Sequence, residues 1–485
     1  MNEGGTVCVA TWGNPRGWRL AEYVSGNARV KAFSTLSILY ELERPLKTIV
    51  VALDTLADLS QLEDGADYSR VEKEAAEIVK QYLCGVDASV VVLPGVLERG
   101  IGAGDRQIFR SEPYGEYLPL FLYATYKEGL RVEGELRLAL DISHGVNFMP
   151  TLAYRAAEEA AAALATARVQ RVELKVYQAD PYPELPPKDG DLLARKPSEP
   201  CAHKDPSAEP PTVRYNQIAK RRLEPWDLAR HTSYEPSPKI LTDSRGCDLA
   251  DARGLPKGVM PLLGAYRLGA LLELALLTKA IPVEEVEGAA EAAVGCLRKK
   301  RSVKRLDGGL KVESGTRLSS GFHALIHAHA VLTGARKLLK FTGPTVELAE
   351  ATATFDEIKK LRELVRGSRV VKALVDVEIS KLERLKESRE ESLQRFLTGS
   401  WKLYADVWRK LGFETGEGEW ESDEEFEMFK RHFIAHAGFH IGIVQLRLRD
   451  NQLELRVHPN KWDEVIKVLK KVVEFPSAAS SSQAN

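Results

Sequence analysis

The chain has 485 residues, of which 44% are hydrophobic and 28% charged, and its formal net charge is −1. This length predicts two or three domains, each able to bury a core of its own. The near-neutral charge excludes a surface that attracts polyanions everywhere, so any nucleic-acid binding must use local patches. The sequence shows neither a membrane-length apolar stretch nor a basic leader followed by an apolar run. We therefore expect a cytoplasmic protein without membrane contact.

The cysteines are scattered along the chain, odd in number and without the close spacing of a metal knuckle. In a cytoplasmic protein, this pattern indicates free thiols rather than a disulfide framework or a metal site. The residues concerned are Cys8, Cys84, Cys201, Cys247 and Cys296.

Residues 1–180 alternate strand-like and helix-like segments. Consecutive Val, Leu and Ile positions are typical of strands buried on both faces. Helices are expected at Tyr68–Tyr82 and at the Ala-rich Met149–Ala167. The alternation predicts a doubly wound, Rossmann-like α/β domain. The expected strands are Thr6–Thr11, Lys47–Leu53, Ser89–Leu93, Leu136–Ile142 and Val172–Tyr177.

The segment 181–254 separates the two predicted domains. Its first part, residues 181–238, is rich in proline. Proline clustering opposes continuous helix or strand, so we expect an extended interdomain linker. The basic run Lys220–Arg222 within it is interpreted as a solvated turn rather than an RNA contact.

Residues 255–476 have helical periodicity, which predicts a mainly α-helical domain. A capping box at Ser422 and Glu425 opens a further helix that runs towards Gly438. The other expected helices are Leu262–Thr278, Val283–Lys299, Gly321–Leu339, Phe355–Arg366, Val375–Leu411 and Trp462–Phe475.

A small β-hairpin interrupts this helical domain. Its strands are Ile443–Arg449 and Gln452–His458, joined at Asp450-Asn451. The Ser-rich residues 477–485 are expected to form a disordered tail.

Doubly wound sheets bind ligands at the carboxyl ends of their strands. Two loops at such ends of the expected strands carry polar residues. One is Thr11–Pro15 and the other is Asp141–Asn147. Gly145 lets the backbone approach a ligand, and Asn147 could cap the following helix, whose free N–H groups can hold phosphate. The alternative is that Asp141 and Asn147 only organise a tight turn.

These loops resemble those of CRISPR-associated CARF proteins. Asp141–Gly145 is similar to the family's D-x-T-H-G motif, with Ser143 in place of threonine, and Trp12–Trp18, Ser34–Leu36 and Ile49–Ala57 are also similar. The resemblance implies a sensor of cyclic oligoadenylates, with cyclic tetra-adenylate favoured over cyclic hexa-adenylate. The ligand would lie across a dimer two-fold. Its implied contacts are Trp12, Gly13, Asn14, Ser34, Ser143, His144, Gly145 and Asn147.

A second motif, in Lys430–Phe439, resembles the R-x-x-x-x-H motif of HEPN ribonucleases. On a helix, Arg431 and His436 fall about 140° apart with the small Ala435 between them. A stripe of Phe426, Phe429 and Phe433 faces away from them and should enter the core. Such a helix is suited to packing on its own copy.

The chemistry of this pair fits ribonuclease action. Imidazole groups titrate near neutral pH, so His436 could act as general base or acid. Arg431 could stabilise the phosphorane charge, giving a 2′,3′-cyclic phosphate and a 5′-OH. The alternative is an exposed arginine and a helix-end histidine that favours the helix dipole.

A CARF-like segment followed by a HEPN-like one is the layout of CRISPR-associated accessory ribonucleases. It implies a homodimeric or larger, cofactor-free endoribonuclease of type III antiviral defence that cuts single-stranded RNA. The rival interpretation is a non-catalytic CARF-type nucleotide sensor or transcriptional regulator. Leu262–Thr278 is too apolar to serve such a regulator as a recognition helix. Whether the sensor domain also degrades its ligand stays open.

Two histidine clusters could bind zinc. His432, His436 and His440 would share a face of an unbroken helix, but Gly438 should end that helix, and no carboxylate follows in phase to orient the imidazoles. His323 and His327 are also spaced by four residues, but no third ligand is evident, so they are interpreted as core or interface histidines. We expect no bound metal.

The basic run Arg298–Arg301, continued by Lys304 and Arg305, leaves two interpretations open. It either guides RNA phosphates to a cleft or forms a solvated turn.

Overall fold

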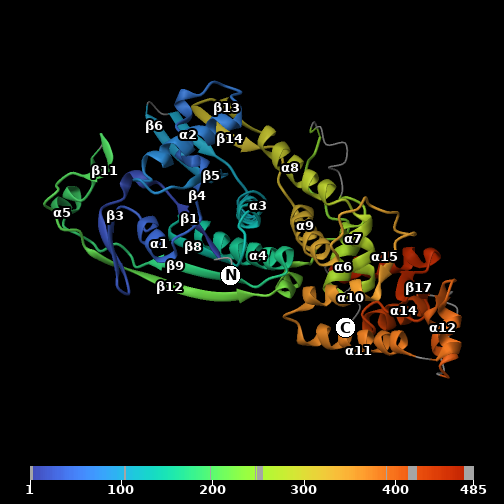
Figure 1. The fold of residues 1–485 in the computed structure, drawn as a ribbon. Helices are drawn as coiled ribbons and strands as arrows, with labels where there is room; N and C mark the ends of the chain where they lie inside the picture. Colours follow the sequence, from blue (N-terminus) through green and yellow to red (C-terminus); the bar gives the residue numbers. More distant parts are fainter. Residues whose placement is uncertain are drawn as a thin grey trace, which may run out of the picture.

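The computed structural model describes residues 4–474, apart from 103–104, 197, 246, 248–254, 389 and 413–422. An α/β half and a helical half lie side by side, and α4 and α9 lie where they meet (Figure 1). None of the helices in the described ranges has the length and apolar character that crossing a membrane requires.

An eight-stranded sheet forms the α/β half, in the order β3-β2-β12-β9-β8-β1-β4-β5. Its five strands from β9 to β5 are all parallel and coincide with the five expected ones. The predicted doubly wound fold is thus confirmed. The strands are β1 (Gly5–Trp12), β2 (Ala21–Ser25), β3 (Ala28–Ala32), β4 (Lys47–Leu53), β5 (Ser89–Leu93), β8 (Leu136–His144), β9 (Val172–Ala179) and β12 (Thr212–Leu223).

Helices cover this sheet, and one of them is buried over most of its length. That helix, α4, starts directly after the loop that follows β8 and packs on α3, on β8 and β9, and on α9 of the helical half. Its alanines allow close approach on several sides at once, so most of its residues are buried. The helices of this half are α1 (Leu36–Glu43), α2 (Tyr68–Gln81), α3 (Tyr117–Leu130) and α4 (Met149–Arg168).

The prediction of an extended linker at 181–254 is wrong for much of this segment. It contains α5 (Pro187–Leu192), β10 (Arg195–Lys196), β11 (Glu199–His203) and β12, which pairs with β2 at its start and then runs antiparallel to β9 from Tyr215 to Leu223. Prolines flank β12 but none lies inside it, so it can complete the hydrogen-bonded ladder.

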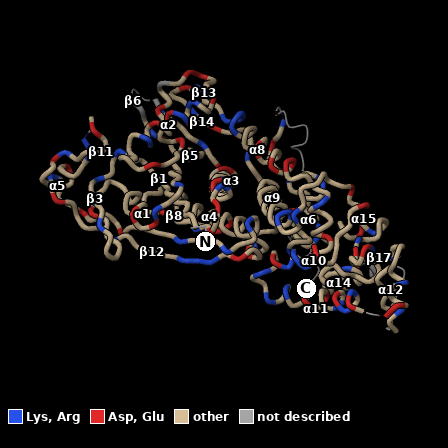
Figure 2. The backbone as a smooth tube through the Cα atoms, viewed as in Figure 1, with Lys and Arg blue, Asp and Glu red and all other residues tan. Residues whose placement is uncertain are grey.

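The basic run Lys220–Arg222 was predicted to be a turn, but it lies on strand β12. Figure 2 shows Lys and Arg residues along this strand. Lys220 pairs with Glu173 at 3.0 Å, and Arg221 pairs with Glu158.

The helical half confirms the predicted class, although two expected helices are broken. Leu262–Thr278 is divided at Gly269, which has φ +75°, and Val375–Leu411 is divided into three helices. Its helices are α6 (Val259–Leu268), α7 (Leu271–Ala280), α8 (Val283–Lys299), α9 (Ser320–Leu339), α10 (Phe355–Leu361), α11 (Arg369–Glu387), α12 (Glu391–Leu397), α13 (Tyr404–Lys410), α14 (Asp423–Ala435) and α15 (Trp462–Val473).

The predicted hairpin is present as β17 (Val444–Arg449) and β18 (Gln452–Val457), within a small sheet that also contains β15 (Ala353–Thr354) and β16 (Lys402–Leu403). Asp450 and Asn451 both have positive φ, as a two-residue hairpin turn requires. The predicted capping residue Ser422 and the tail 477–485 lie outside the described residues.

A third sheet joins the two halves. It pairs β13 (Arg301–Leu306) and β14 (Gly309–Ser314) with β7 (Asp105–Phe109) and β6 (Leu97–Gly102). Arg301 is buried against the α/β half, 3.0 Å from Asp54 and 2.6 Å from Glu116. Both interpretations of the basic run are therefore wrong for Arg301, since neither solvent nor RNA reaches a side chain held in this way.

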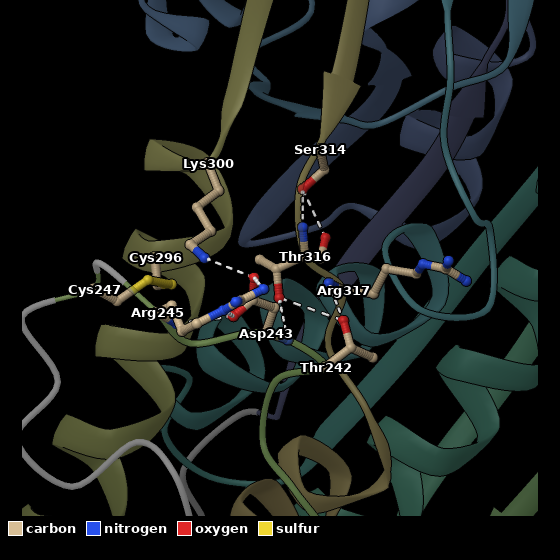
Figure 3. Close-up of a disulfide and its surroundings, with 9 residues drawn as sticks. All are labelled: Thr242, Asp243, Arg245, Cys247, Cys296, Lys300, Ser314, Thr316 and Arg317. Carbon is tan, nitrogen blue, oxygen red and sulfur yellow. Dashed lines mark hydrogen bonds and ion pairs between the residues drawn. A yellow bond between two sulfur atoms is a disulfide. The ribbon is translucent and has the colours of Figure 1, made fainter.

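The prediction of free thiols is also wrong. Cys84 pairs with Cys201, and Cys247 pairs with Cys296, with Cα–Cα distances of 5.3 and 5.6 Å. The second disulfide ties the segment before Cys247 to the end of α8, beside an ion pair of Lys300 with Asp243 (Figure 3). The partners are 117 and 49 residues apart, so spacing alone could not reveal them.

We predict that the denatured, unreduced chain exposes one reactive thiol, that of Cys8, and that reduction exposes five. Closing loops of this length stabilises a chain by about 4 to 5 kcal/mol each in the chain-entropy model, so reduction should lower the melting temperature. A thiol titration with and without reductant checks the pairing. Five thiols before reduction would contradict it.

Candidate functional site

The two polar loops meet at the carboxyl end of the central strands. Neighbouring parallel strands β1 and β8 bring them together, and the backbone N–H of Gly13 donates to the carbonyl of His144 at 2.7 Å. The two loops that carry most of the implied ligand contacts therefore lie side by side.

A buried carboxylate organises the second loop. Asp141 accepts hydrogen bonds from the Thr35 hydroxyl and from the backbone and hydroxyl of Ser143, the latter two at 2.9 and 2.5 Å. The Ser143 hydroxyl in turn accepts from the N–H of Ala179 at 2.9 Å. Burial raises the pKa of Asp141. Asp141 and Ser143 thus hold the loop in shape.

The His144 ring is fixed on two sides. It stacks on Trp18 with ring centroids 4.1 Å apart, and its Nε2 accepts from the backbone N–H of Thr35 at 3.1 Å. Burial lowers the pKa of His144 to about 3, so the ring is neutral at physiological pH. Because Nε2 accepts, the proton of the neutral ring lies on Nδ1, which can donate to a ligand.

The other predicted contacts differ in exposure. Trp12 and Ser34 are buried, whereas Asn14 and Asn147 are exposed at the loop tips. A Cβ added to Gly145 would lie 2.6 Å from the Thr11 hydroxyl, so this position requires glycine.

The expected capping role of Asn147 is wrong. Phe148 occupies the N-cap of α4 without a side-chain cap, and Asn147 has φ +53°. Asn147 adopts a left-handed backbone conformation in the turn before the helix, and its side chain is exposed to solvent.

A pocket of about 470 Å³ opens beside this loop and is lined by Ser143 and His144 among others. Its wall also includes Trp18, Arg19 and Tyr182, which were not predicted as ligand contacts. Trp18 could have been found, since it closes the same WGNPRGW segment. Tyr182 could not, because it arrives from the segment expected to be a linker.

The second predicted pair lies at the end of α14. Arg431 is exposed, and His436 follows the last helical residue with its side chain 45% exposed. Phe429 and Phe433 are buried as predicted, while the side chain of Phe426 lies outside the described residues. The structure thus presents Arg431, Ala435 and His436 on the accessible side of the helix end.

The sequence indicated no carboxylate in helical phase with these histidines, but a carboxylate from another helix contacts His436. Glu378 of α11 is buried and lies 2.9 Å from His436 Nδ1, and Lys381 lies 2.7 Å from the same carboxylate oxygen. This contact leaves His436 Nε2 as the ring nitrogen available to a substrate. Glu378 precedes His436 by 58 residues, so helical phase could not indicate it.

Gly438 ends the helix as predicted, with φ +86°. His440 consequently turns into the core, where burial lowers its pKa to about 4 and its Nδ1 accepts from the N–H of Gly442 at 3.1 Å. Among the described residues, His432, His436 and His440 do not bring their ring nitrogens to a common point.

A second carboxyl group lies beneath this turn. Glu273 of α7 is fully buried next to Gly438, and within the described residues neither of its side-chain oxygens has a hydrogen-bond partner. Burial raises its pKa to about 8. A side chain at Gly438 would collide with this carboxyl, so the turn requires glycine on both conformational and steric grounds.

The fold and these two sites define a two-domain protein of the CARF–HEPN class. The family model for the CARF domain of CRISPR system endoribonuclease Csx1 matches residues 7–181, and that for its HEPN domain matches residues 368–460. The first match contains all eight predicted ligand contacts, and the second contains Arg431, His436 and Glu378. The chain therefore belongs to the CRISPR-associated CARF–HEPN family.

A curated relative is the CRISPR system endoribonuclease Csx1 of Methanocaldococcus jannaschii. It is 30% identical over 178 residues, which are 36% of this chain. The chain spans 37% of the length of that relative.

We predict that Glu273→Gln changes the pH dependence of stability. The pKa of this carboxyl is 4.5 in the unfolded chain and about 8 in the folded protein. The free energy of unfolding of the wild type should therefore fall as the pH rises from 4.5 to about 8, because the unfolded chain loses the proton first. The free energy of unfolding of the variant should match that of the wild type below pH 4.5 and exceed it above pH 8 by about 5 kcal/mol. Melting temperatures across this range measure the difference. Parallel curves for the two proteins would show that Glu273 does not titrate in this way.

Proposed function

We propose that this chain is a metal-independent endoribonuclease that cuts single-stranded RNA and is activated by a cyclic oligoadenylate, as a cytoplasmic effector of type III CRISPR antiviral defence. The observation that carries the proposal is the pairing of His436 with Glu378 beside the exposed Arg431, in the segment that matches the HEPN model. The loop built on Asp141 and His144 lies in the CARF match of the same chain.

The proposed reaction uses the substrate's own 2′-hydroxyl as nucleophile. Its oxygen attacks the adjacent phosphorus while its proton passes to a base, and the bond from phosphorus to O5′ breaks as an acid protonates the leaving oxygen. The products are a 2′,3′-cyclic phosphate and a 5′-OH. His436 Nε2 supplies one of the two proton transfers, and the guanidinium of Arg431 stabilises the charge on the phosphorane.

A dimer would supply the second proton-transfer group. Arg431, Ala435 and His436 lie together on an accessible surface with a small residue at its centre. Two copies of this surface related by a two-fold axis would place two arginines and two imidazoles around one phosphodiester. We therefore propose a homodimer or a larger homo-oligomer as the active form.

The proposed activator binds at the loops that follow β1 and β8, with cyclic tetra-adenylate favoured over the hexa-adenylate. The neutral His144 can donate from Nδ1 to a base or a phosphate oxygen. Trp18, Arg19 and Tyr182 extend the contact surface into the adjoining pocket. The proposed sensor domain consists of residues 1–180 together with strand β12, which belongs to the same sheet. The proposed ribonuclease domain is 255–476.

Activation requires that the ligand bind one dimer arrangement more tightly than another. Helix α4 begins at the ligand loop and packs against α9 of the helical half, so a shift of the loop moves a packed element between the domains. The favoured arrangement is the one that aligns the two Arg431/His436 pairs.

We predict that Arg431→Ala and His436→Ala each lower RNA cleavage by about 100-fold or more while leaving cyclic oligoadenylate binding unchanged. The reason is that each removes a group acting on the phosphodiester, whereas the ligand loops lie in the other domain. Cleavage of labelled RNA and ligand calorimetry measure the two properties separately. Near wild-type cleavage by either variant would refute the assigned site.

His432→Ala is the matched control, because it removes an exposed imidazole from the same helix without touching the proposed pair. It should cleave normally. RNA with a 2′-deoxy nucleotide at the cleavage position should resist cleavage, and excess chelator should leave the chemistry intact at temperatures well below melting. Loss of activity in His432→Ala and in chelator, with recovery on adding zinc, would favour a zinc mechanism.

We predict that the double variant His144→Ala and Asn147→Ala loses activation while remaining folded, since Asn147 is exposed and His144 is the last residue of β8, with its side chain lining the pocket. Removing one good hydrogen bond to a charged ligand costs about 1.5–3 kcal/mol, so ligand affinity should fall by at least tenfold. The ligand concentration for half-maximal cleavage measures this effect. Unchanged activation at low ligand concentration would show that the activator binds elsewhere.

A further inference from the structure

A buried carboxylate and two imidazoles converge where the two halves meet. Glu159 of α4 lies 2.7 Å from His323 Nδ1 and 2.9 Å from His327 Nε2, and both histidines belong to α9. The sequence offered no third ligand for this pair of histidines. Glu159 supplies it from 164 residues earlier in the chain, because α4 and α9 pack against each other.

A third imidazole completes the cluster. His231 ends the 3₁₀ helix Pro225–His231, and its Nδ1 lies 4.0 Å from the second carboxylate oxygen of Glu159. The side chains of His231 and His323 are 25% and 21% exposed, whereas that of His327 is fully buried. The cluster is thus closed on the core side and open to solvent on one side.

The charge of Glu159 lacks an ordinary counter-ion. Its side chain is 5% exposed, and in the described part of the chain all its ion pairs are with histidines. A buried carboxylate among imidazoles needs either an added proton or a bound cation to offset its charge. Imidazole nitrogen and carboxylate oxygen are also donors that zinc prefers.

We infer that Glu159, His323 and His327 form a binding site for a divalent transition metal of the zinc type. Their donor atoms lie within 4.8 Å of one another, and His231 or a water on the open side completes a tetrahedral set. Tyr234 lies 2.6 Å from His327 Nδ1 and so orients that ring, as partners of metal-bound histidines usually do.

Such a metal would join the domains directly. It would link α4, which starts at the ligand loop, to α9 of the helical half. None of its ligands lies on α14 or α11, so the inference is independent of the proposed metal-free cleavage.

Zinc binding to the full chain tests the inference. Chelator-treated protein, freed of chelator, is titrated with Zn²⁺ in a calorimeter, and the retained metal is counted by elemental analysis. We expect one zinc per chain and a higher melting temperature in the zinc-bound protein. Cobalt(II) in the same site should give the visible absorption of a tetrahedral complex.

His323→Ala should lower zinc affinity by more than about 100-fold, since loss of a ligand exceeds the effect of losing an outer partner. This side chain is partly exposed, so the variant should fold, and Glu159→Gln provides a second variant. His329→Ala is the control, because His329 lies on the same helix but contacts Tyr126 instead. Wild-type protein that takes up no zinc, or His323→Ala that binds as the wild type does, would overturn the inference. So would zinc binding lost in His432→Ala instead.

Discussion

The closely packed helix α4 holds the α/β half and the helical half together. This helix begins at the loop shaped by Asp141, crosses under the sheet and ends against the helical half. The sheet, α3 and α9 all pack against this helix, so only small side chains fit along much of its length. Its sequence is correspondingly rich in alanine. A tightly packed helix cannot be displaced at one end without moving its neighbours. The loop that follows β8 and the helical half are therefore connected through packed side chains.

Charged groups held out of water also link the two halves. Arg301 reaches from β13 to Asp54 and Glu116, and Glu159 reaches from α4 to the α9 histidines. Breaking a buried pair leaves an uncompensated charge, which costs several kcal/mol. These pairs thus specify one arrangement of the two halves. Glu378 acts similarly inside the helical half, where it fixes the ring of His436.

Local patterns in the sequence predicted much of this fold. The five parallel strands, the hairpin at Asp450-Asn451 and the helix end at Gly438 follow from apolar periodicity and turn chemistry, which act over a few residues. Long-range pairings were missed: β12 beside β9, the two disulfides, and the carboxylates Glu159 and Glu378 that contact histidines. Each joins residues whose proximity only the packed structure creates.

The proposed function requires that a ligand at the loops after β1 and β8 control cleavage at the end of α14. Labelled single-stranded RNA, incubated with the full chain alone, with cyclic tetra-adenylate and with cyclic hexa-adenylate, tests it most directly. We predict slow cleavage without ligand, strong stimulation by the tetra-adenylate, and products that end in a 2′,3′-cyclic phosphate. Equal cleavage under all three conditions, or no cleavage under any of them, would contradict it.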